Sequence, residues 1–168
     1  MLIRGEQPAD LAAIRQVNEA AFGQPAEADL VDRLRANGKA VLSLVAEDNG
    51  MIVGHILFSE VSIDVNPQAV KLIGLAPLAV LPAHQRSSIG SQLSRAGLEH
   101  CRALGYDAAV VLGHPEYYPR FGFVPASQFG IKSEYDVRDE VFMAMELRER
   151  TLADCHGLVR YQAEFSEL

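Results

Sequence analysis

Three long runs of Val, Ile and Leu, separated by two short turn sequences, set the strongest limit on how this chain can fold. The runs are AVLSLVAE (40–47), MIVGHILFSEVSI (51–63) and VKLIGLAPLAVL (70–81). Runs of this kind favour β-strands. The sequence DNG (48–50) between the first two runs is a hairpin turn signal, and NPQ (66–68) makes the next turn. The sequence therefore predicts an antiparallel meander of three strands.

Helical patterns lie on both sides of the meander. Apolar residues recur at helical spacing from Leu11 to Ala21, behind Asp10 as a candidate cap, and AEADLVDRLRANG (26–38) predicts a second short helix. After the meander, one apolar stripe predicts a helix from about Ile89 to Leu104, which Gly105 would end.

The rest of the chain contains further strands and no regular alternation of strands and helices. DAAVVLG (107–113) is typical of a buried strand, EVFMAMEL (140–147) is another strand, and GLVRYQAEF (157–165) is a last candidate. The pattern favours an α/β (α+β) fold with a mixed sheet flanked by helices. We expect one domain over 1–168, with its core in about 1–147 and an extra strand in the tail, 148–168. An exposed strand edge there would favour a homodimer.

Charge and composition limit the partners of the protein. With 15 Lys and Arg against 22 Asp and Glu, the formal net charge is −7, whereas a nucleic-acid binder usually carries a basic stripe. No stretch approaches the roughly 18 apolar residues of a membrane span, and the first residues lack the apolar core of a signal peptide. We therefore expect a cytoplasmic protein that binds neither nucleic acid nor membrane.

The cysteines and histidines predict no redox or metal chemistry. Cys101 and Cys155 lie far apart without a CxxC motif, so we expect reduced thiols. Cys101 falls on the apolar stripe of its helix and should be buried, whereas Cys155 lies in the polar LADCHG (152–157) and should be exposed. The five histidines show no metal-ligand spacing, so no metal is expected.

A proline and a helix start, close together, mark the candidate site. Proline cannot donate to a sheet ladder, so Pro77 suggests that the sheet opens there and leaves backbone groups of Leu78, Ala79 and Val80 free to pair. HQRSSIG (84–90) then leads into a helix, whose first N–H groups have no internal partner, and Arg86 adds a positive charge. This arrangement favours an anion or phosphate site. Spacing alone is equally compatible with a serine-capped helix and a solvated arginine.

Two motifs in register resemble the GNAT N-acetyltransferases. LAVLPAHQRSSIGSQL (78–93) resembles the acyl-CoA-binding signature of that family, Q/R-x-x-G-x-G/A after a V-x-P strand end. Gln85 and Gly90 match its ends, and Ser88 stands where the family has its first glycine. YYPRFGF (117–123) resembles the Y-x-x-x-G-F segment of the family, with Tyr118 four residues before the glycine. The order of elements over about 1–147 is also similar, and the chain looks most like an uncharacterised bacterial branch of predicted acetyltransferases.

The resemblance implies a GNAT fold, with a mixed, mostly antiparallel central sheet of about six to seven strands flanked by about four helices. It also implies acetyl-CoA as co-substrate. Its pantetheine arm would pair with the strand end at 78–80, and its pyrophosphate would lie on the amides of 86–90. The implied cofactor-binding residues are Leu78, Ala79, Val80, Gln85, Arg86, Ser87, Ser88, Ile89, Gly90 and Ser91. If position 88 requires a positive φ, serine costs about 1 kcal/mol there, although its hydroxyl could donate to phosphate.

The resemblance also implies acetyl transfer to a primary amine by direct attack in a ternary complex. The attacking amine must be neutral, the oxyanion needs a donor, and the leaving thiolate needs a proton or charge stabilisation. A backbone N–H around Val80 could polarise the carbonyl. Tyr118 matches the general acid of the family, and the alternative is a packing tyrosine in an aromatic cluster, which is typical of a core.

Two questions stay open at this level. The candidates for the general base are Glu60, His84, His114 and Glu116, and each also fits a solvated surface residue. The amine acceptor is a small metabolite, an antibiotic amine, or a protein N-terminus or lysine. The alternative function is a non-catalytic acyl-CoA-binding module, which Ser88 and the lack of an obvious base would favour.

Overall fold

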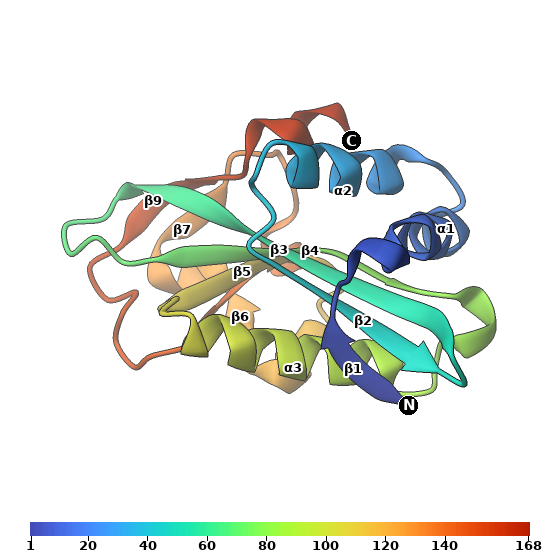
Figure 1. Ribbon diagram of the computed structural model, residues 1–168. Helices are drawn as coiled ribbons and strands as arrows, with labels where there is room; N and C mark the ends of the chain where they lie inside the picture. The colour runs from blue at the N-terminus through green and yellow to red at the C-terminus, as the bar shows by residue number, and fades with distance from the viewer. The chain divides into compact units, whose positions relative to one another are not determined.

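The computed structural model describes residues 1–168 and contains nine strands and three α-helices (Figure 1). The strands are β1 (Leu2–Gly5), β2 (Leu42–Asp48), β3 (Met51–Val65), β4 (Leu72–Val80), β5 (Ala108–Leu112), β6 (Val124–Pro125), β7 (Ile131–Ser133), β8 (Phe142–Glu146) and β9 (His156–Arg160). The α-helices are α1 (Leu11–Phe22), α2 (Ala26–Ala36) and α3 (Ile89–Ala103). Six short 3-10 helices are η1 (Pro8–Asp10), η2 (Pro82–His84), η3 (Tyr118–Phe121), η4 (Ala126–Phe129), η5 (Asp139–Val141) and η6 (Ala163–Glu167). None of these helices is both long and apolar enough to cross a membrane.

The chain divides into two compact units. Unit 1 comprises Met1–Ser59, Ala76–Gly97 and Ala163–Leu168, and unit 2 comprises Glu60–Leu75 and Leu98–Gln162. Three elements, β3, β4 and α3, continue from one unit into the other. The expectation of a single domain over 1–168 stays a prediction.

The first hairpin of the predicted meander is confirmed in unit 1. Strands β2 and β3 pair antiparallel from Leu42↔Phe58 to Asp48↔Met51. Their turn has φ of 51° at Asn49 and 77° at Gly50, which is the combination that two-residue hairpin turns require. The sequence did not predict β1, which pairs antiparallel with the other side of β2.

Helices α1 and α2 are confirmed, but Asp10 does not cap α1. Its carboxylate instead accepts two hydrogen bonds from the Arg4 guanidinium, at 2.8 and 3.0 Å, and one from the Gln7 amide at 2.7 Å. The hydrogen bond from Arg4 is the main reason that the pKa of Asp10 lies below its usual range. Both carboxylate oxygens of Asp10 are thus engaged by Arg4 and Gln7 rather than by the first amides of α1.

Adjacent residues of β3 face the helices on opposite sides of the strands of unit 1. A Cβ built on Gly54 would lie 2.9 Å from Leu93 Cδ1 and 3.0 Å from Ile89 Cγ2, both on α3. The next side chain, His55, contacts Asn18 of α1 instead, because successive strand residues point to opposite faces. Figure 1 shows α1 and α3 on these two sides.

A second glycine seats α3 on the same strand. A Cβ built on Gly97 would lie 2.7 Å from Cζ of Phe58, whose side chain is fully buried. The two glycines therefore allow α3 to lie closer to β3 than any larger residue would permit. This close packing sets the position of the N-terminus of α3.

Replacing Gly97 with alanine should destabilise the protein, although alanine is the better helix former by about 1 kcal/mol. The added methyl group would meet the buried ring of Phe58, and overpacking of this kind costs about 1–3 kcal/mol. Urea denaturation of Gly97→Ala measures the change in unfolding free energy. In a Phe58→Leu background the cost should shrink, because the ring is gone. A single variant more stable than the parent protein would contradict the packing described here.

Strands β3 and β4 are also hydrogen-bonded neighbours in the sheet, and unit 2 contains further strand pairs. Strands β4 and β5 are parallel, β5 and β8 are antiparallel, and β6 pairs antiparallel with β8. Strand β9 lies between β3 and β7, antiparallel to the first and parallel to the second. The predicted strands at 107–113 and 140–147 are confirmed as β5 and β8, and β9 overlaps the first part of the candidate at 157–165.

The strand and helix counts differ from the expectation, while the mixed, mostly antiparallel arrangement agrees with it. There are nine strands rather than six to seven, because β1, β6 and β7 contain only two to four residues. Segments this short carry too little periodicity to be recognised in a sequence. There are three α-helices rather than four, and the other helical turns are short 3-10 segments.

The two cysteines are both buried, so the prediction was right for Cys101 and wrong for Cys155. Cys155 is 2% exposed, and its Sγ lies 3.6 Å from Asn66 Oδ1 and 3.7 Å from the Thr151 carbonyl oxygen. Burial raises the pKa of Cys155, and it raises the pKa of Cys101 to about 12. Polar neighbours in the sequence did not reveal that the chain folds back over this thiol.

The C-terminal residues belong to unit 1. The carboxylate of Glu164 in η6 accepts hydrogen bonds from Asn37 Nδ2 at 2.6 Å and from Lys39 Nζ at 2.9 Å. These bonds, the one from Lys39 first, lower the pKa of Glu164 to about 2. The end of the chain is thus attached just beyond the C-terminus of α2.

Candidate active site

The end of strand β4 is the first component of the candidate site. The ladder with β5 covers only Leu72–Gly74, whereas β4 continues through Pro77 to Val80. The amide of Leu81 donates to the Val53 carbonyl oxygen at 2.9 Å, which holds this end of the chain to β3. The strand therefore extends beyond its parallel partner, at the position where the proline predicted an opening.

One backbone group at this strand end is not free as predicted. Gln85 Nε2 donates to the carbonyl oxygen of Val80 at 3.0 Å. The side chain of Gln85 thus closes the loop back onto the strand. The sequence could not show this contact, because it depends on the turn that η2 makes between the two residues.

The loop that follows holds two residues in the left-handed region. Arg86 has a φ of 65° and Ser88 a φ of 67°, a conformation that costs a non-glycine residue about 1–2 kcal/mol. Position 88 therefore does have the positive φ at which serine was expected to carry a steric cost. The Ser87 hydroxyl donates to the His84 carbonyl oxygen, and the backbone amide of Gln92 donates to the Ser88 carbonyl oxygen at 2.9 Å.

Helix α3 begins directly after this loop. Ile89 is buried and fastens the first turn to the sheet, while the residues from Gln85 to Ser88 are exposed. The first amides of a helix have no internal acceptor and carry the positive end of the helix dipole. Together with the exposed guanidinium of Arg86, they can bind an anionic group such as a phosphate.

Tyr118 opens the 3-10 helix η3 in unit 2 and is 8% exposed. Its ring lies so close to Gly113 that a Cβ there would be 2.8 Å from Cδ2 of the tyrosine. The rings of Tyr117 and Phe123 meet it edge-on, with centroids 5.0 and 5.9 Å away. After η3 the chain turns at Gly122, whose φ of 109° gives a backbone reason for a glycine there.

Burial raises the pKa of Tyr118, and the neighbouring Tyr117 adds to the effect. The phenol therefore stays protonated at neutral pH and can act as a proton donor. The aromatic cluster expected as the packing alternative is also present, so the ring packs in a core whatever the hydroxyl does.

The four candidate bases lie in different environments. Glu60 is exposed and its Oε1 accepts a hydrogen bond of 2.6 Å from the Tyr106 hydroxyl. His114 and Glu116 are exposed, and Nδ1 of His84 is buried without a hydrogen-bond partner. None of these contacts distinguishes one residue as the base.

Several residues that shape the site were not identified from the sequence. Gly54 and Gly113 allow close approach of α3 and of the tyrosine ring, and Gln92 donates from Nε2 to the Ser88 hydroxyl oxygen at 2.9 Å. The spacing of four residues between Ser88 and Gln92 on a helix start is the signal that could have found the last contact.

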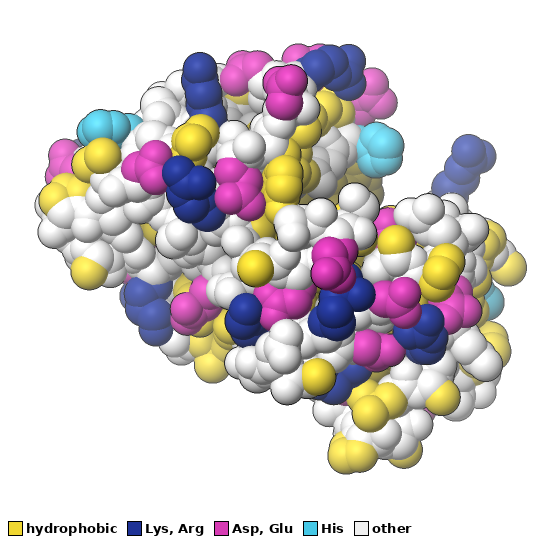
Figure 2. Space-filling model, turned by 90° about the horizontal axis from the view of Figure 1, so that it is seen from above, with side chains coloured by type: hydrophobic (Ala, Val, Ile, Leu, Met, Phe, Trp, Pro, Cys, Tyr) yellow, Lys and Arg dark blue, Asp and Glu magenta, His cyan; other side chains and the backbone are white.

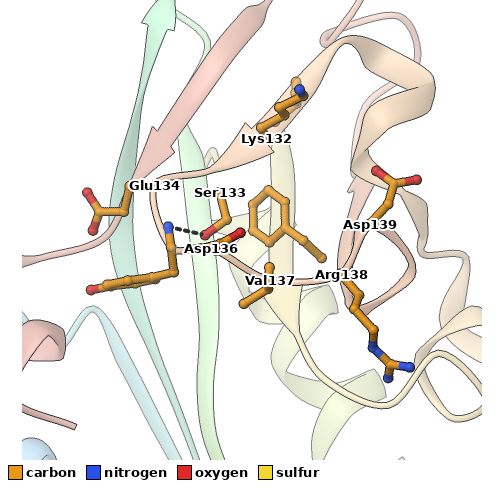
Figure 3. Close-up of a pocket in the computed structure, with 10 residues that line it drawn as sticks. Lys132, Ser133, Glu134, Asp136, Val137, Arg138 and Asp139 are labelled. Carbon is orange, nitrogen blue, oxygen red and sulfur yellow. Dashed lines mark hydrogen bonds between the residues drawn. The ribbon is translucent and has the colours of Figure 1, made fainter.

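Unit 2 also has an open cavity of about 370 Å³ lined by residues 131–139 and Phe142 (Figure 3). Both acidic and basic side chains line it, among them Glu134, Asp136 and Arg138. No residue of the predicted site lines this cavity.

Charges of both signs are interspersed over the face drawn in Figure 2, with no continuous basic stripe.

Comparison with known proteins places these features in a family. The model of a protein family described as an acetyltransferase (GNAT) domain matches residues 3–126. YhbS of Escherichia coli K12, named an uncharacterized N-acetyltransferase, is 36% identical over 167 residues, which are 99% of each chain. The crystal structure of E. coli YhbS in complex with CoA has a TM-score of 0.93 at 34% identity, over 98% of this chain and 91% of that chain. A GNAT family acetyltransferase from Brucella melitensis in complex with acetyl-CoA has a TM-score of 0.80 at 38% identity, over 98% and 97% of the two chains.

The family match takes in the loop after β4 as well as the tyrosine of η3. The resemblance noted in the two motifs and the fold class expected from it are therefore confirmed. With both sequence and structure agreeing over nearly the whole length, the chain belongs to the GNAT family of N-acetyltransferases.

Proposed function

We propose that this protein transfers the acetyl group of acetyl-CoA to a primary amine. The observation that carries the proposal is the end of β4, which runs past its parallel partner into a loop at the N-terminus of α3. Support comes from the relatives: YhbS is crystallised with CoA and the Brucella protein with acetyl-CoA.

The cofactor would bind along unit 1 from β4 to α3. Its pantetheine arm pairs with backbone groups of Leu78, Ala79 and Val80. The hydrogen bond from Gln85 Nε2 to the Val80 carbonyl oxygen holds the loop against the end of the strand. Its pyrophosphate lies on the amides from Arg86 to Gly90 at the positive end of the α3 dipole. The full set comprises Leu78, Ala79, Val80, Gln85, Arg86, Ser87, Ser88, Ile89, Gly90 and Ser91.

The reaction is a direct attack in a ternary complex. The neutral amine attacks the thioester carbonyl carbon, a C–N bond forms, and a backbone N–H near Val80 stabilises the oxyanion. Collapse of this intermediate breaks the C–S bond, and the thiolate takes a proton from the hydroxyl of Tyr118. The amine loses its proton to solvent, from which the tyrosine is reprotonated.

The environments of the candidate bases favour a second function, an acyl-CoA-binding module without turnover. Glu60 already accepts a hydrogen bond from Tyr106, and His114 and Glu116 are exposed. Solvent can accept the proton in place of a side chain, so we place catalysis first. Assembly as a homodimer and a cytoplasmic location stay predictions.

Two measurements on the same preparation test the proposal. Titration calorimetry with acetyl-CoA should show binding with a dissociation constant between about 1 µM and 1 mM, the range of ordinary substrate affinities. Release of free thiol should then depend on an amine, in a panel of polyamines, aminoglycosides and peptides with free N-termini or lysines. Binding without turnover on any amine would favour the binding module, and absence of binding would contradict both functions.

A further inference from the structure

Ser88 and Gln92 form a hydrogen-bonded pair at a position where the GNAT signature has a glycine in place of the serine. Gln92 Nε2 donates to Ser88 Oγ at 2.9 Å, and the Gln92 amide donates to the Ser88 carbonyl oxygen at 2.9 Å. Both side chains are exposed. The hydroxyl oxygen therefore acts as an acceptor, which leaves the hydroxyl proton available for another partner.

Serine is an unfavourable choice for the backbone at this position. Ser88 has a φ of 67°, where glycine would carry no steric penalty. Backbone strain of this kind is concentrated at functional sites, where the surrounding structure holds it in place. The side chain that causes the strain is also the one that presents a hydrogen-bond donor beside the first amides of α3.

We propose that Gln92 is a positioning residue that orients the Ser88 hydroxyl as a side-chain donor to the pyrophosphate of CoA. The inference rests on the proposed function, since it assigns the pyrophosphate to this loop. The oxygen of Ser88 is held by Gln92, and its proton reaches an oxygen of the ligand. The hydroxyl thus adds a charge-assisted hydrogen bond to those of the loop amides.

Ligands that contain or lack the pyrophosphate separate this role from a general one. Ser88→Ala should bind CoA and dephospho-CoA about tenfold more weakly, the size of one hydrogen bond to a charged group. Its affinity for pantetheine, measured by competition against CoA, should stay unchanged. Ser88→Gly should bind CoA equally weakly, but its melting temperature without ligand should rise by about 2–4 °C as the strain is removed.

The contribution of Gln92 is tested by combining variants. Gln92→Met, a neutral side chain of similar length, should weaken CoA binding about threefold in the parent protein. In the Ser88→Ala background it should change nothing, because no hydroxyl is left to orient. In acetyl transfer, both variants should raise KM for acetyl-CoA and leave kcat unchanged. Glu99→Gln, on an exposed part of α3, is the matched control and should bind as the parent protein does.

The outcomes distinguish this inference from the proposed function. If the parent protein binds neither CoA nor dephospho-CoA, the proposed function fails and the inference falls with it. If the parent protein binds CoA and Ser88→Ala binds it equally well, only the inference is overturned. An equal loss of pantetheine affinity in Ser88→Ala, or a full effect of Gln92→Met in that background, would also overturn it.

Discussion

Replacing Tyr118 with phenylalanine should lower kcat by about 10²–10⁴-fold, the usual contribution of a positioned proton donor, and leave acetyl-CoA binding intact. The variant lacks only the hydroxyl. Its ring would keep the close contact with Gly113 and the edge-on contacts with Tyr117 and Phe123. The fold should therefore persist, and lost turnover would report on chemistry. Amine-dependent thiol release measures kcat, and calorimetry on the same sample measures the dissociation constant.

Tyr117→Phe is the matched control, since it removes the same atom from the adjacent tyrosine. Tyr117 packs edge-on against the ring of Tyr118, and its carbonyl oxygen accepts a hydrogen bond from Arg120. Neither contact requires the hydroxyl, so turnover should stay near that of the parent protein. Because the pKa of Tyr118 is raised, the parent rate should not fall through loss of this proton below about pH 10. Normal turnover of Tyr118→Phe would leave Tyr118 as a packing residue only.

Acidification to pH 5 should destabilise the protein by about 2 kcal/mol through His55 alone. His55 is fully buried, with Nε2 2.9 Å from Ser43 Oγ and Nδ1 3.2 Å from Asn18 Nδ2. The Ser43 hydroxyl donates to Glu6 Oε1 at 2.6 Å, so its oxygen is free to accept from Nε2–H. Asn18 Nδ2 donates to the Ile14 carbonyl oxygen at 3.0 Å. This contact fixes which end of the Asn18 amide is the nitrogen, so Asn18 is also the donor to His55 Nδ1. The imidazole is therefore neutral. Protonation at Nδ1 would place an N–H donor of His55 opposite the N–H donor of Asn18, which is repulsive.

Burial lowers the pKa of His55 to about 4, with Glu6 opposing the shift and Arg35 adding to it. The pKa in the unfolded chain is about 6.5, so the unfolded state binds the proton first as the pH falls. The contribution is fully present above pH 6.5 and is lost progressively as the pH drops towards 4. The carboxyl groups with lowered pKa, Glu6, Asp10 and Glu164, lose their contributions at lower pH, so the interval from pH 7.5 to 5 reports mainly on the histidine.

Urea denaturation at several pH values in this interval measures the effect. His55→Gln cannot take up the proton, so its unfolding free energy should vary less between pH 7.5 and 5 than that of the parent protein. His114→Gln removes an exposed histidine and should keep the parent pH dependence. Equal pH dependence in the parent protein and His55→Gln would contradict the assignment of a buried neutral imidazole.

Local patterns in the sequence were sufficient for much of the fold. The long strands β2 to β4, the turn at Asn49 and Gly50, and all three α-helices follow from residue spacing and turn chemistry, which act over a few neighbouring residues. The loop from Gln85 to Gly90 could be singled out for the same reason. Its residues combine a strand end, a helix start and a positive charge within one short segment.

The contacts that complete the site were decided by the tertiary structure. The side-chain amide of Gln85 donates a hydrogen bond to the Val80 carbonyl oxygen. Gly54 leaves room for α3 and Gly113 leaves room for the Tyr118 ring. Outside the site, Cys155 is buried by segments that are distant in the sequence. Residue spacing determined which segments become strands, helices and turns, because those preferences are local. Which side chains meet was settled only when distant segments packed together, since a close approach depends on the shape and position of both partners.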